Sequence, residues 1–410
     1  MKLNTTKLIQ VGFHHFEEDV PLGRLLLHEG QVLFEYDAAF LKKNLNVSPF
    51  HLPLKTGVQI GKADLFDGLP GVFNDSLPDG WGKLLLDRSL LAKGIPPQQL
   101  NPLDRLAFVG KSGMGALTYK PELDKKNENE ILDLDRLAHE SAVILKGETS
   151  EILHQLVAMG GSSAGARPKV LVGYHPKQNQ IISGQQQIPP EYEHWLVKFP
   201  SSLDLPDIAL IELAYAKMAK AAGIEMSAST VLQGASGENY FATKRFDRLK
   251  NKRIHVHTAC GLLNADHRYP SLDYENLMRA TLSLSKDMRE VEKVFRLAVF
   301  NVFAHNRDDH SKNFSFIMDA KGNWKFAPAY DLTFSYGPGG EHSSMVMGEG
   351  RNPGTVHLLK LAEKFQMNNA QQIIDEVKEA VHQWPKIAQS LNVGNESLTT
   401  IQKQIDLQLK

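Results

Sequence analysis

The chain has 410 residues, of which 42% are hydrophobic and 23% charged, as is ordinary for a globular protein of two or three domains. Its 46 basic and 47 acidic residues give a net charge of −1. The overall charge therefore gives no electrostatic reason to expect binding to nucleic acid or to an anionic membrane. One cysteine, Cys260, excludes an intramolecular disulfide framework, and no apolar run suits a signal peptide or a membrane span. We therefore expect a cytoplasmic protein.

The first 120 residues predict an α+β domain. Three short runs are typical of β-strands, and one intervening segment is typical of a helix: RLLLHEG (24–30), QVLFEYD (31–37), GALTYK (115–120) and WGKLLLDRSLLAK (81–93). A polar, charged stretch then follows at 121–133. We accordingly predict an N-terminal subdomain at 1–120, a linker with a first helix at 121–148, and a larger mixed domain at 149–410.

A run of small residues precedes the next predicted strand, in GGSSAGARPKVLVGY (160–174). Such residues let a backbone approach a ligand closely, and their N–H groups can surround phosphates. Gly160 and Gly165 have the glycine spacing of a Walker A loop, but Ala166-Arg167 stands where that loop requires Lys-Ser/Thr. Taken alone, the run is more often an ordinary turn before a strand.

Residues 194–200 (HWLVKFP) alternate like a strand and carry Lys198, at the place where kinases carry a phosphate-contacting lysine. An exposed strand lysine is the commoner alternative. The next segment, 208–223 (IALIELAYAKMAKAAG), predicts an amphipathic helix that ends at Gly223. Its Glu212 is a candidate partner for Lys198.

A further strand is predicted at 239–249 (NYFATKRFDRL). Within it, the backbone of Lys244, Arg245 and Phe246 is a candidate adenine-binding hinge. The alternative for Arg245 and Arg248 is a role in surface ion pairs.

Residues 286–304 predict a helix with a broad buried face, and the polar stretch HNRDDHSKN that follows predicts a loop. FSFIM (314–318) and WKFAPAYD (324–331) then predict a hairpin. Protein kinases likewise place an Asp five residues before an Asn, and a second Asp after a short β-excursion. Here these residues are Asp308, Asn313 and Asp331.

A lone Asp-x4-Asn match has little value, because Asp, Asn and His also form loops and helix caps. A metal-hydrolase site is a second alternative, with His305, Asp308, Asp309 and His310 as possible ligands. The kinase interpretation is favoured because the other expected segments occur upstream in the expected order.

Together these blocks resemble the HipA family of bacterial Ser/Thr kinases, the toxins of HipBA-type toxin–antitoxin pairs. The resemblance covers nearly the whole chain, and it rests on several blocks that are specific only in combination: LFEYD (33–37), SPFHLPL (48–54), FNDSLPDGWG (73–82), FVGKSGMGALTY (108–119), SSAGARPK (162–169), LVKFP (196–200), KRFDR (244–248), NRDDHSKNFS (306–315) and APAYDL (327–332). It implies an α+β fold with a two-lobed, protein-kinase-like core.

The resemblance also implies residue roles. Asp308 would accept the hydroxyl proton, and Asn313 and Asp331 would bind Mg²⁺. ATP would be held by further residues: Ala164, Gly165, Ala166, Arg167, Pro168 and Lys169 as the phosphate-binding loop, Lys198 at the phosphates, Lys244, Arg245 and Phe246 as the hinge, and His310, Ser311, Lys312 and Tyr330 around the nucleotide and metal. Ser162 aligns with the autophosphorylated serine of the family, with Ser163 as a near neighbour.

Members of this family phosphorylate cytosolic translation proteins, notably aminoacyl-tRNA synthetases. They pair with a small helix-turn-helix antitoxin, so DNA is contacted only indirectly. A small-molecule kinase of the aminoglycoside or lipid class and a corepressor acting with a DNA-binding antitoxin are the alternatives.

Two positions depart from the family pattern. Asp309 stands where the best-known members have Gly, and its charge would assist Mg²⁺ or raise the pKa of Asp308. Arg167-Pro168 replaces a Gln-Glu pair in the loop, which bears on how freely the loop moves.

Overall fold

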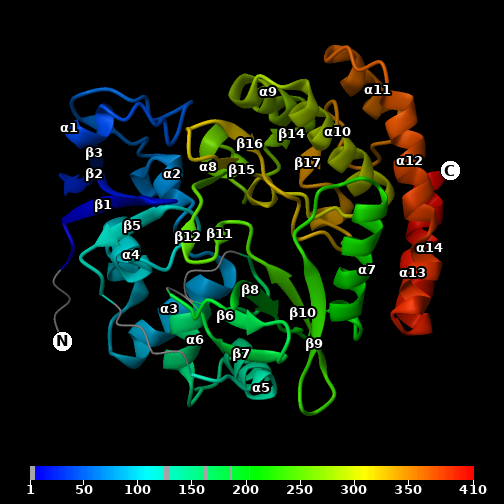
Figure 1. Ribbon diagram of the computed structural model, residues 1–410, viewed down its shortest axis with the longest axis horizontal. Coiled ribbons are helices and arrows are strands. Elements are labelled where there is room, and N and C mark those ends of the chain that lie inside the picture. The colour runs from blue at the N-terminus through cyan, green and yellow to red at the C-terminus, as the bar shows by residue number, and fades with distance from the viewer. Residues whose placement is uncertain (1–4, 124–129, 161–164, 185–186, 203) are drawn as a thin grey trace. The chain divides into compact units, whose positions relative to one another are not determined.

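The structure groups the chain into two units whose segments are not contiguous in sequence. Unit 1 contains Met1–Ser202, Leu232–His257 and Met318–Gly322, and unit 2 contains Leu203–Val231, Thr258–Ile317 and Asn323–Lys410. This computed structural model describes residues 5–123, 130–160, 165–184, 187–202 and 204–410 (Figure 1). The end of the predicted N-terminal subdomain, residue 120, falls inside unit 1.

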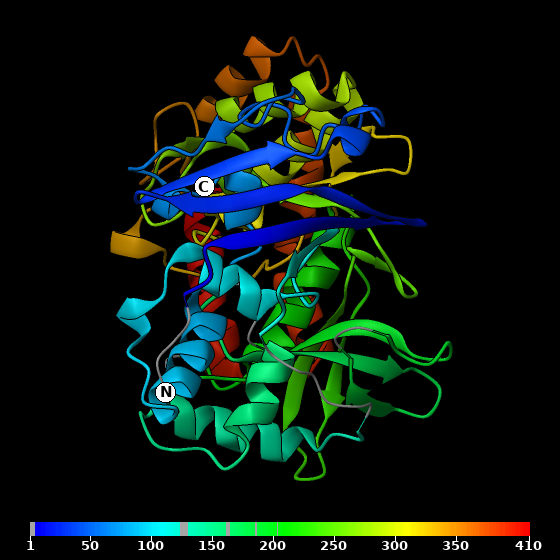
Figure 2. The same cartoon turned by 90° about the vertical axis from the view of Figure 1, so that its left-hand side faces the viewer.

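Unit 1 begins with a five-stranded antiparallel sheet, in the order β4-β3-β2-β1-β5 (Figure 2). Its strands are β1 (Leu8–His15), β2 (Glu18–His28), β3 (Gln31–Tyr36), β4 (Gln59–Ile60) and β5 (Leu117–Lys120). The strands predicted at 24–30, 31–37 and 115–120 are thus confirmed as parts of β2, β3 and β5. β1 was not predicted, although Ile9, Val11 and Phe13 alternate inward along it as a half-buried strand requires.

Short helices connect this sheet to the rest of unit 1: α1 (Ala38–Leu41), η1 (Phe66–Gly68), α2 (Gly71–Asn74), α3 (Gly80–Ala92), η2 (Pro97–Gln99) and α4 (Pro102–Val109). The predicted helix at 81–93 is α3. A capping box starts α4, because Asn101 and Asp104 each accept a backbone N–H of the other.

A second sheet places β7 (Gln180–Ser183), β6 (Lys169–His175), β8 (Glu193–Lys198) and β10 (Asn239–Lys244) side by side in that order. One of its faces is covered by α5 (Leu134–Leu145) and α6 (Leu153–Gly160). The remaining strands of this region are β9 (Ser229–Gln233), β11 (Arg248–Leu249), β12 (Lys252–Arg253) and β13 (Val256–Thr258). The segment predicted as one strand over 239–249 is therefore two strands, interrupted at residues 245–247.

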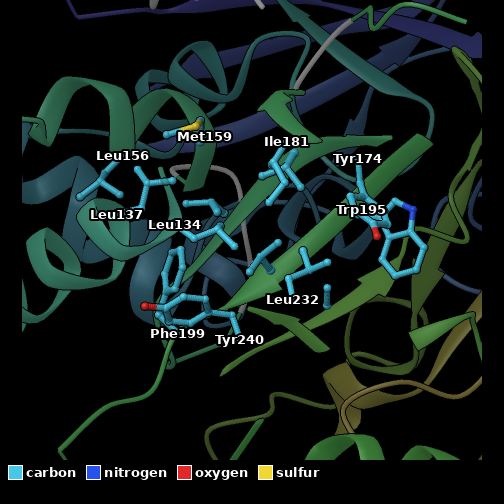
Figure 3. Close-up of a cluster of buried hydrophobic side chains, with 14 of the residues drawn as sticks. Leu134, Leu137, Leu156, Met159, Tyr174, Ile181, Trp195, Phe199, Leu232 and Tyr240 are labelled. Carbon is cyan, nitrogen blue, oxygen red and sulfur yellow. The ribbon is translucent and has the colours of Figure 1, made fainter. Parts of the chain in front are cut away.

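The core under this sheet joins residues from distant parts of the sequence (Figure 3). Val170, Val197 and Trp195 of the strands belong to this cluster, together with Leu156 of α6 and the fully buried Trp81 of α3. The N-terminal 120 residues therefore contribute to the core on which the second sheet is built.

Unit 2 is mainly helical. Its elements are α7 (Ile208–Ala221), α8 (Ala259–Leu263), β14 (Leu272–Asp273), α9 (Tyr274–Ser285), α10 (Met288–Phe303), η3 (Ser311–Asn313), β15 (Ser315–Met318), β16 (Trp324–Phe326), η4 (Pro338–Gly340), β17 (Ser344–Met345), α11 (Thr355–Lys364), α12 (Ala370–His382), α13 (Trp384–Ser390) and α14 (Asn395–Leu409). The predicted helices at 208–223 and 286–304 correspond to α7 and α10, and the predicted hairpin to β15 and β16.

The helix α10 is the centre of unit 2, with α9 and α12 packed along it (Figure 1). Asp287 caps its N-terminus by accepting the Arg289 N–H at 2.9 Å. A broad apolar face is buried, including Val294, Ala298 and Val302. No helix among the described residues is long and apolar enough to cross a membrane.

Candidate active site

Unit 2 fixes the loop that follows α10 by backbone and amide hydrogen bonds. His305 leaves the helix in the left-handed region, with φ +55°. The Asn306 backbone N–H then donates to the Asn301 carbonyl at 2.9 Å, and its side-chain amide donates to the Asn301 side-chain oxygen at 2.9 Å. All three residues are buried, so the loop starts from a rigid base.

The side chain of Asp309 faces a buried polar cluster. Its carboxylate accepts hydrogen bonds from the Tyr274 hydroxyl (2.9 Å), His342 Nδ1 (3.0 Å) and the Ser344 backbone N–H (3.1 Å). Asn301 also donates to the Tyr274 hydroxyl, at 2.8 Å. Asp309 is only 1% exposed, so it anchors the loop. Asp309 therefore has a structural role in the loop, and the expectation that its charge would assist Mg²⁺ or raise the pKa of Asp308 stays a prediction.

Asp308 is exposed although both of its neighbours are buried. On one side, the Arg307 carbonyl accepts the Ser343 backbone N–H at 3.1 Å and the Ser343 hydroxyl at 3.2 Å. On the other side is the anchored Asp309. The backbone at Asp308 is thus fixed while its side chain is exposed, which suits a group that must meet a substrate at a set position.

Asn313 is linked directly to Asp308. It lies in η3, a 3-10 helix of one turn, where its side-chain amide donates to the Asp308 carbonyl at 2.7 Å. Because the nitrogen of the amide makes that bond, its oxygen is turned away from the carbonyl and is a suitable cation ligand. The predicted pairing of Asp308 with Asn313 is thus present as a contact.

Tyr330 brings the second acid close to the same turn. Its hydroxyl donates to the Lys312 carbonyl and hydrogen-bonds the Ser315 hydroxyl, each at 2.6 Å. Asp331 follows in the left-handed region at φ +56°, a backbone strain that non-glycine residues accept mainly where the surroundings enforce it. β16 ends at Phe326, so Asp331 lies in the segment after the strand and not at its end as the sequence indicated.

The other predicted residues of unit 2 surround this turn. His310 Nδ1 accepts the Lys312 backbone N–H at 3.3 Å, and its ring centroid lies 5.8 Å from that of His267. The Ser311 hydroxyl donates to the Ala265 carbonyl at 2.6 Å. Ser311 and Lys312 are buried, so both contribute to the stability of the turn.

The metal-hydrolase alternative is not supported. Among the described residues, no three His, Cys, Asp or Glu side chains are arranged to hold a metal ion. His305 Nδ1 faces the Ser335 carbonyl at 3.1 Å, and the ring stacks on Phe334. Burial lowers the pKa of His305 to about 4, so the ring is neutral at pH 7.

In unit 1, two buried lysines face each other on neighbouring strands. Lys169 on β6 and Lys198 on β8 are in direct register, and Lys198 is in register with Phe241 of β10. These three side chains therefore share the face opposite the Trp195 and Val197 core. The two lysines are 4% and 7% exposed.

The loop before β6 is described from Gly165 onward. Ser162, Ser163 and Ala164 lie outside the described residues. Gly165 has φ +93°, and a Cβ there would overlap the Lys169 ammonium group. The amine of Lys169 therefore lies against the backbone of Gly165, in the predicted phosphate-binding loop. The Pro168 carbonyl accepts the Phe199 N–H at 2.9 Å, which joins the end of the loop to the residue after Lys198.

The proposed hinge residues continue from β10. The Arg245 N–H donates to the His194 carbonyl at 2.9 Å, so this amide is used by the sheet. Lys244 pairs with Glu193 at 2.6 Å, and Phe246 is half-buried. The hinge position therefore follows directly on the strand beside Lys198.

Arg245 and Arg248 are buried, so the alternative of surface ion pairs is wrong. Both donate to the carboxylate of Asp247, at 2.7 and 2.6 Å, and Asp247 is fully buried. Burial opposes ionisation of Asp247, but the two guanidinium groups outweigh it and hold its pKa well below the ordinary value. The same Asp247 oxygen also accepts the Gly115 backbone N–H at 2.9 Å, so this charged group links residues 245–248 to the segment before β5.

The structure thus assembles the predicted residues as two sets. Lys169, Lys198 and the hinge belong to unit 1, and Asp308, Asn313, Tyr330 and Asp331 to unit 2. Lys198 and its candidate partner Glu212 lie in different units, and both are buried.

Some residues that shape the site were missed. Tyr274, His342 and Ser344 support Asp309 from 33 to 35 positions away. No local pattern in the sequence indicates these contacts, because they depend on how α9 and the segment around β17 pack on the loop.

Comparison with known proteins identifies the fold and the family. The structure matches a chain of the Shewanella oneidensis complex of the toxin HipA, HipB and operator DNA, with a TM-score of 0.70 and 15% identity, over 98% of this chain and 95% of that one. The likeness establishes that this chain has the mixed helix-and-sheet fold of that HipA chain.

Two family descriptions match the sequence itself: "HipA N-terminal domain" over residues 16–120 and "HipA-like C-terminal domain" over residues 161–384. The chain belongs to the HipA family.

Two curated relatives carry provisional kinase names. One, from Haemophilus influenzae, is 25% identical over 174 residues, which is 39% of this chain and 51% of that protein. The other, from Sinorhizobium fredii, is 29% identical over 190 residues, which is 42% of this chain and 41% of that protein. The match thus spans about half the length of these relatives or less.

Proposed function

We propose that the protein is an ATP- and Mg²⁺-dependent serine/threonine protein kinase. The observation that carries the proposal is the exposed carboxylate of Asp308 on a buried, hydrogen-bonded loop, with the Asn313 amide bound to its carbonyl at 2.7 Å. Phosphoryl transfer requires mainly positioning and charge stabilisation, which such a rigid set supplies. The Asp308 carboxylate would accept the proton of the substrate hydroxyl as its oxygen bonds to the γ-phosphorus and the bond to ADP breaks.

The oxygen donors of unit 2 suit Mg²⁺. The amide oxygen of Asn313 and the carboxylate of Asp331 are hard ligands, which Mg²⁺ prefers, and it commonly takes one or two from protein and the rest from phosphates and water. Mg²⁺ bound there would neutralise charge on the ATP phosphates. The residues themselves hold their places through the Tyr330 hydroxyl and η3.

Residues of unit 1 would bind the phosphates of ATP. Lys169 and Lys198 supply two buried side-chain amines on one face of the sheet, and that of Lys169 lies against the backbone at Gly165. Adenine would bind the backbone of Lys244, Arg245 and Phe246.

Binding of Mg-ATP is the first test. A ligand that binds only the native state stabilises it by about 2.7 kcal/mol at a hundred-fold excess over Kd. We expect the melting temperature to rise with Mg-ATP, and to rise less in Asp331→Asn. An unchanged melting curve at millimolar Mg-ATP, in protein shown by mass spectrometry to be unphosphorylated, would refute the nucleotide site.

The proposed substrate is a cytosolic translation protein of the aminoacyl-tRNA synthetase class, as in the family. Purified protein, γ-labelled ATP and a cytosolic extract would be incubated together, with Asp308→Asn as the control. Label that appears in a protein band only with the unchanged enzyme supports the proposal. Label that appears only in small molecules supports the small-molecule kinase alternative.

We further propose that the enzyme phosphorylates its own Ser162. A phosphate brings about −1.5 to −2 charges, which would repel ATP phosphates and switch the site off. Intact-mass measurement after incubation with Mg-ATP should show one added phosphate, lost in Ser162→Ala and in Asp308→Asn. Phosphate retained in Ser162→Ala and mapped to Ser163 would move the site by one residue.

A helix-turn-helix antitoxin is the proposed partner, because the structural match is to a HipA, HipB and operator DNA complex. The net charge of −1 gives no basis for strong direct binding to DNA, so DNA contact and any corepressor role would depend on the antitoxin. A gene for such a protein beside this one, and copurification of the two products, would support the pairing.

A further inference from the structure

Two residues at the start of α3 hold the end of the phosphate-binding loop. The carboxylate of Asp79 accepts the Gly165 backbone N–H. The Trp81 backbone N–H donates to the Gly165 carbonyl at 2.9 Å, so Gly165 is held from both sides. The Trp81 indole N–H donates to the Lys169 carbonyl at 3.0 Å. Both ends of the segment 165–169 are therefore bound to residues 79–81.

The two backbones approach so closely that glycine is required. Gly80 has φ +40°, and a Cβ on it would lie 2.6 Å from the Gly165 oxygen and 2.7 Å from the Ala166 Cα. A Cβ on Gly160 would lie 2.7 Å from the Lys169 oxygen and 3.0 Å from Trp81 Nε1. Real Cβ contacts essentially never fall below 3.0 Å, so these glycines are part of the contact.

The side that holds the loop is itself rigid. Trp81 is fully buried, in the same core cluster as Leu85, Val170 and Val197. The indole therefore cannot move without disturbing the core under the second sheet. Asp79 is half-buried. Its backbone is fixed to α3, because the Asp79 carbonyl accepts the Lys83 N–H at 3.3 Å.

We propose that Asp79, supported by Trp81, is a positioning residue for ATP binding. It holds residues 165–169 in one conformation, so that Lys169 and the loop backbone are ordered before the phosphates arrive. A loop that is already ordered loses less entropy on binding, and the affinity for ATP rises accordingly. The inference rests on the proposed kinase function and assigns to the segment 79–81 a role within it.

The test compares Asp79→Ala with Asp79→Asn. The probe is a non-hydrolysable ATP analogue with Mg²⁺, and its Kd is measured by isothermal titration, which needs no protein substrate. We expect Kd to rise about tenfold in Asp79→Ala, since a hydrogen bond to a charged group is lost. We expect a change of less than about threefold in Asp79→Asn, because the amide oxygen still accepts the Gly165 N–H.

Asp135→Ala is the matched control. The Asp135 carboxylate also accepts a backbone N–H from a distant loop, that of Ser236 at 2.7 Å, and it makes no contact with residues 165–169 among those described. Its loss should leave Kd unchanged. If Asp79→Ala does not fold, Trp81→Phe takes its place, because it keeps a buried ring but removes the donor to the Lys169 carbonyl, and Kd should again rise.

Hydrogen exchange separates this inference from the proposed function. Without any nucleotide, the peptide containing residues 165–169 should exchange faster in Asp79→Ala than in the unchanged protein, and at the unchanged rate in Asp79→Asn. If the unchanged protein binds no nucleotide but shows this exchange pattern, the kinase proposal fails and the structural contact stands. A folded Asp79→Ala with unchanged Kd, or tighter binding in both Asp79 variants, would overturn the positioning role; the latter would show that the carboxylate repels ATP.

Discussion

At the residue scale, two adjacent acids have opposite environments. Asp308 is exposed, whereas Asp309 is 1% exposed and accepts three hydrogen bonds from groups of unit 2. Adjacent positions in the chain therefore do not give Asp308 and Asp309 the same role. The hydrogen-bond partners and the exposure of each carboxylate determine its role. The added acid, which stands where the best-known family members have Gly, acts as an internal support for the loop.

Substitution of each acid by Asn separates the two roles. Asp308→Asn should abolish phosphoryl transfer and leave the unfolding free energy within about 0.5 kcal/mol, because an exposed carboxylate is replaced by an isostere. Asp309→Asn should lower the unfolding free energy by about 2–4 kcal/mol, because buried donors lose a charged acceptor. Urea unfolding and phosphate incorporation would be measured for both. Activity retained in Asp308→Asn and lost in a stable Asp309→Asn would exchange the assignments.

Three buried histidines make stability depend on pH. Burial lowers the pKa of His194 and His305 to about 4 and that of His255 to about 3, against an ordinary value of 6.5. Below pH 6.5 the unfolded chain takes up protons that the native rings do not, so the stabilisation is complete above 6.5 and is lost as the pH falls toward 4.

We expect the unfolding free energy to fall by up to about 2 kcal/mol per such histidine between pH 7 and pH 5. Urea titrations at several pH values would measure the slope. His255→Gln should make the slope shallower, and the exposed His28→Gln should leave it unchanged. Equal slopes in all three proteins would exclude His255 as a source of the acid sensitivity.

At the scale of elements, one charged cluster joins segments that lie more than 130 positions apart. Asp247 binds Arg245, Arg248 and the Gly115 N–H. Arg253 donates to the carbonyls of Gly115, Gly113 and Leu117, at 2.7, 2.8 and 3.2 Å. Guanidinium groups thus donate to backbone carbonyls of the irregular segment before β5 and of Leu117, the first residue of β5.

Asp247→Ala should therefore destabilise the protein strongly. It leaves two buried guanidinium groups without their counter-charge, which typically costs about 3–5 kcal/mol. The exposed cross-strand pair Arg24–Glu35 is the control, and Arg24→Ala should cost less than about 1 kcal/mol. Urea unfolding would compare them, and similar losses in the two variants would contradict the structural role of the cluster.

At the scale of the whole molecule, the region matched by the N-terminal family description and the region after it share one core in unit 1. Trp81 and Leu85 are fully buried and belong to the same core cluster as Leu156, Met159 and Val170. The Trp81 indole also satisfies the Lys169 carbonyl. The region that would carry the phosphate-binding loop therefore lacks part of its core when it is considered without residues 1–120.

A fragment of residues 121–410 should consequently fail to fold. The loss of a buried Trp alone costs about 3–5 kcal/mol, which is comparable with the whole stability of many domains. Expression alone should give insoluble or aggregated protein, and coexpression with residues 1–120 should recover soluble material. Circular dichroism and size-exclusion chromatography would decide; a monomeric, cooperatively unfolding fragment would contradict the shared core.

The sequence by itself determined the main local elements and the identity of the chemical groups. Periodicity was sufficient for α3, α7 and α10, because a helix buries one face at a fixed spacing. Alternation was sufficient for β2, β3, β8 and β15, whereas the site that the spacing of Asp308, Asn313 and Asp331 indicated stays a prediction. A single strand at 239–249 was predicted where two exist, since local pattern does not register that Arg245 turns inward to Asp247.

Only the tertiary structure decided which of these residues are exposed and what holds them. The burial of Asp309 depends on Tyr274 and His342, and the fixing of Gly165 depends on Asp79 and Trp81. Such contacts join residues about 30 to 90 positions apart. Residues so far apart form no periodic pattern in the sequence, so the sequence alone does not reveal that they are in contact. They arise when packed elements bring the partners together, which is why the groups of the site could be read from the chain and their positioning could not.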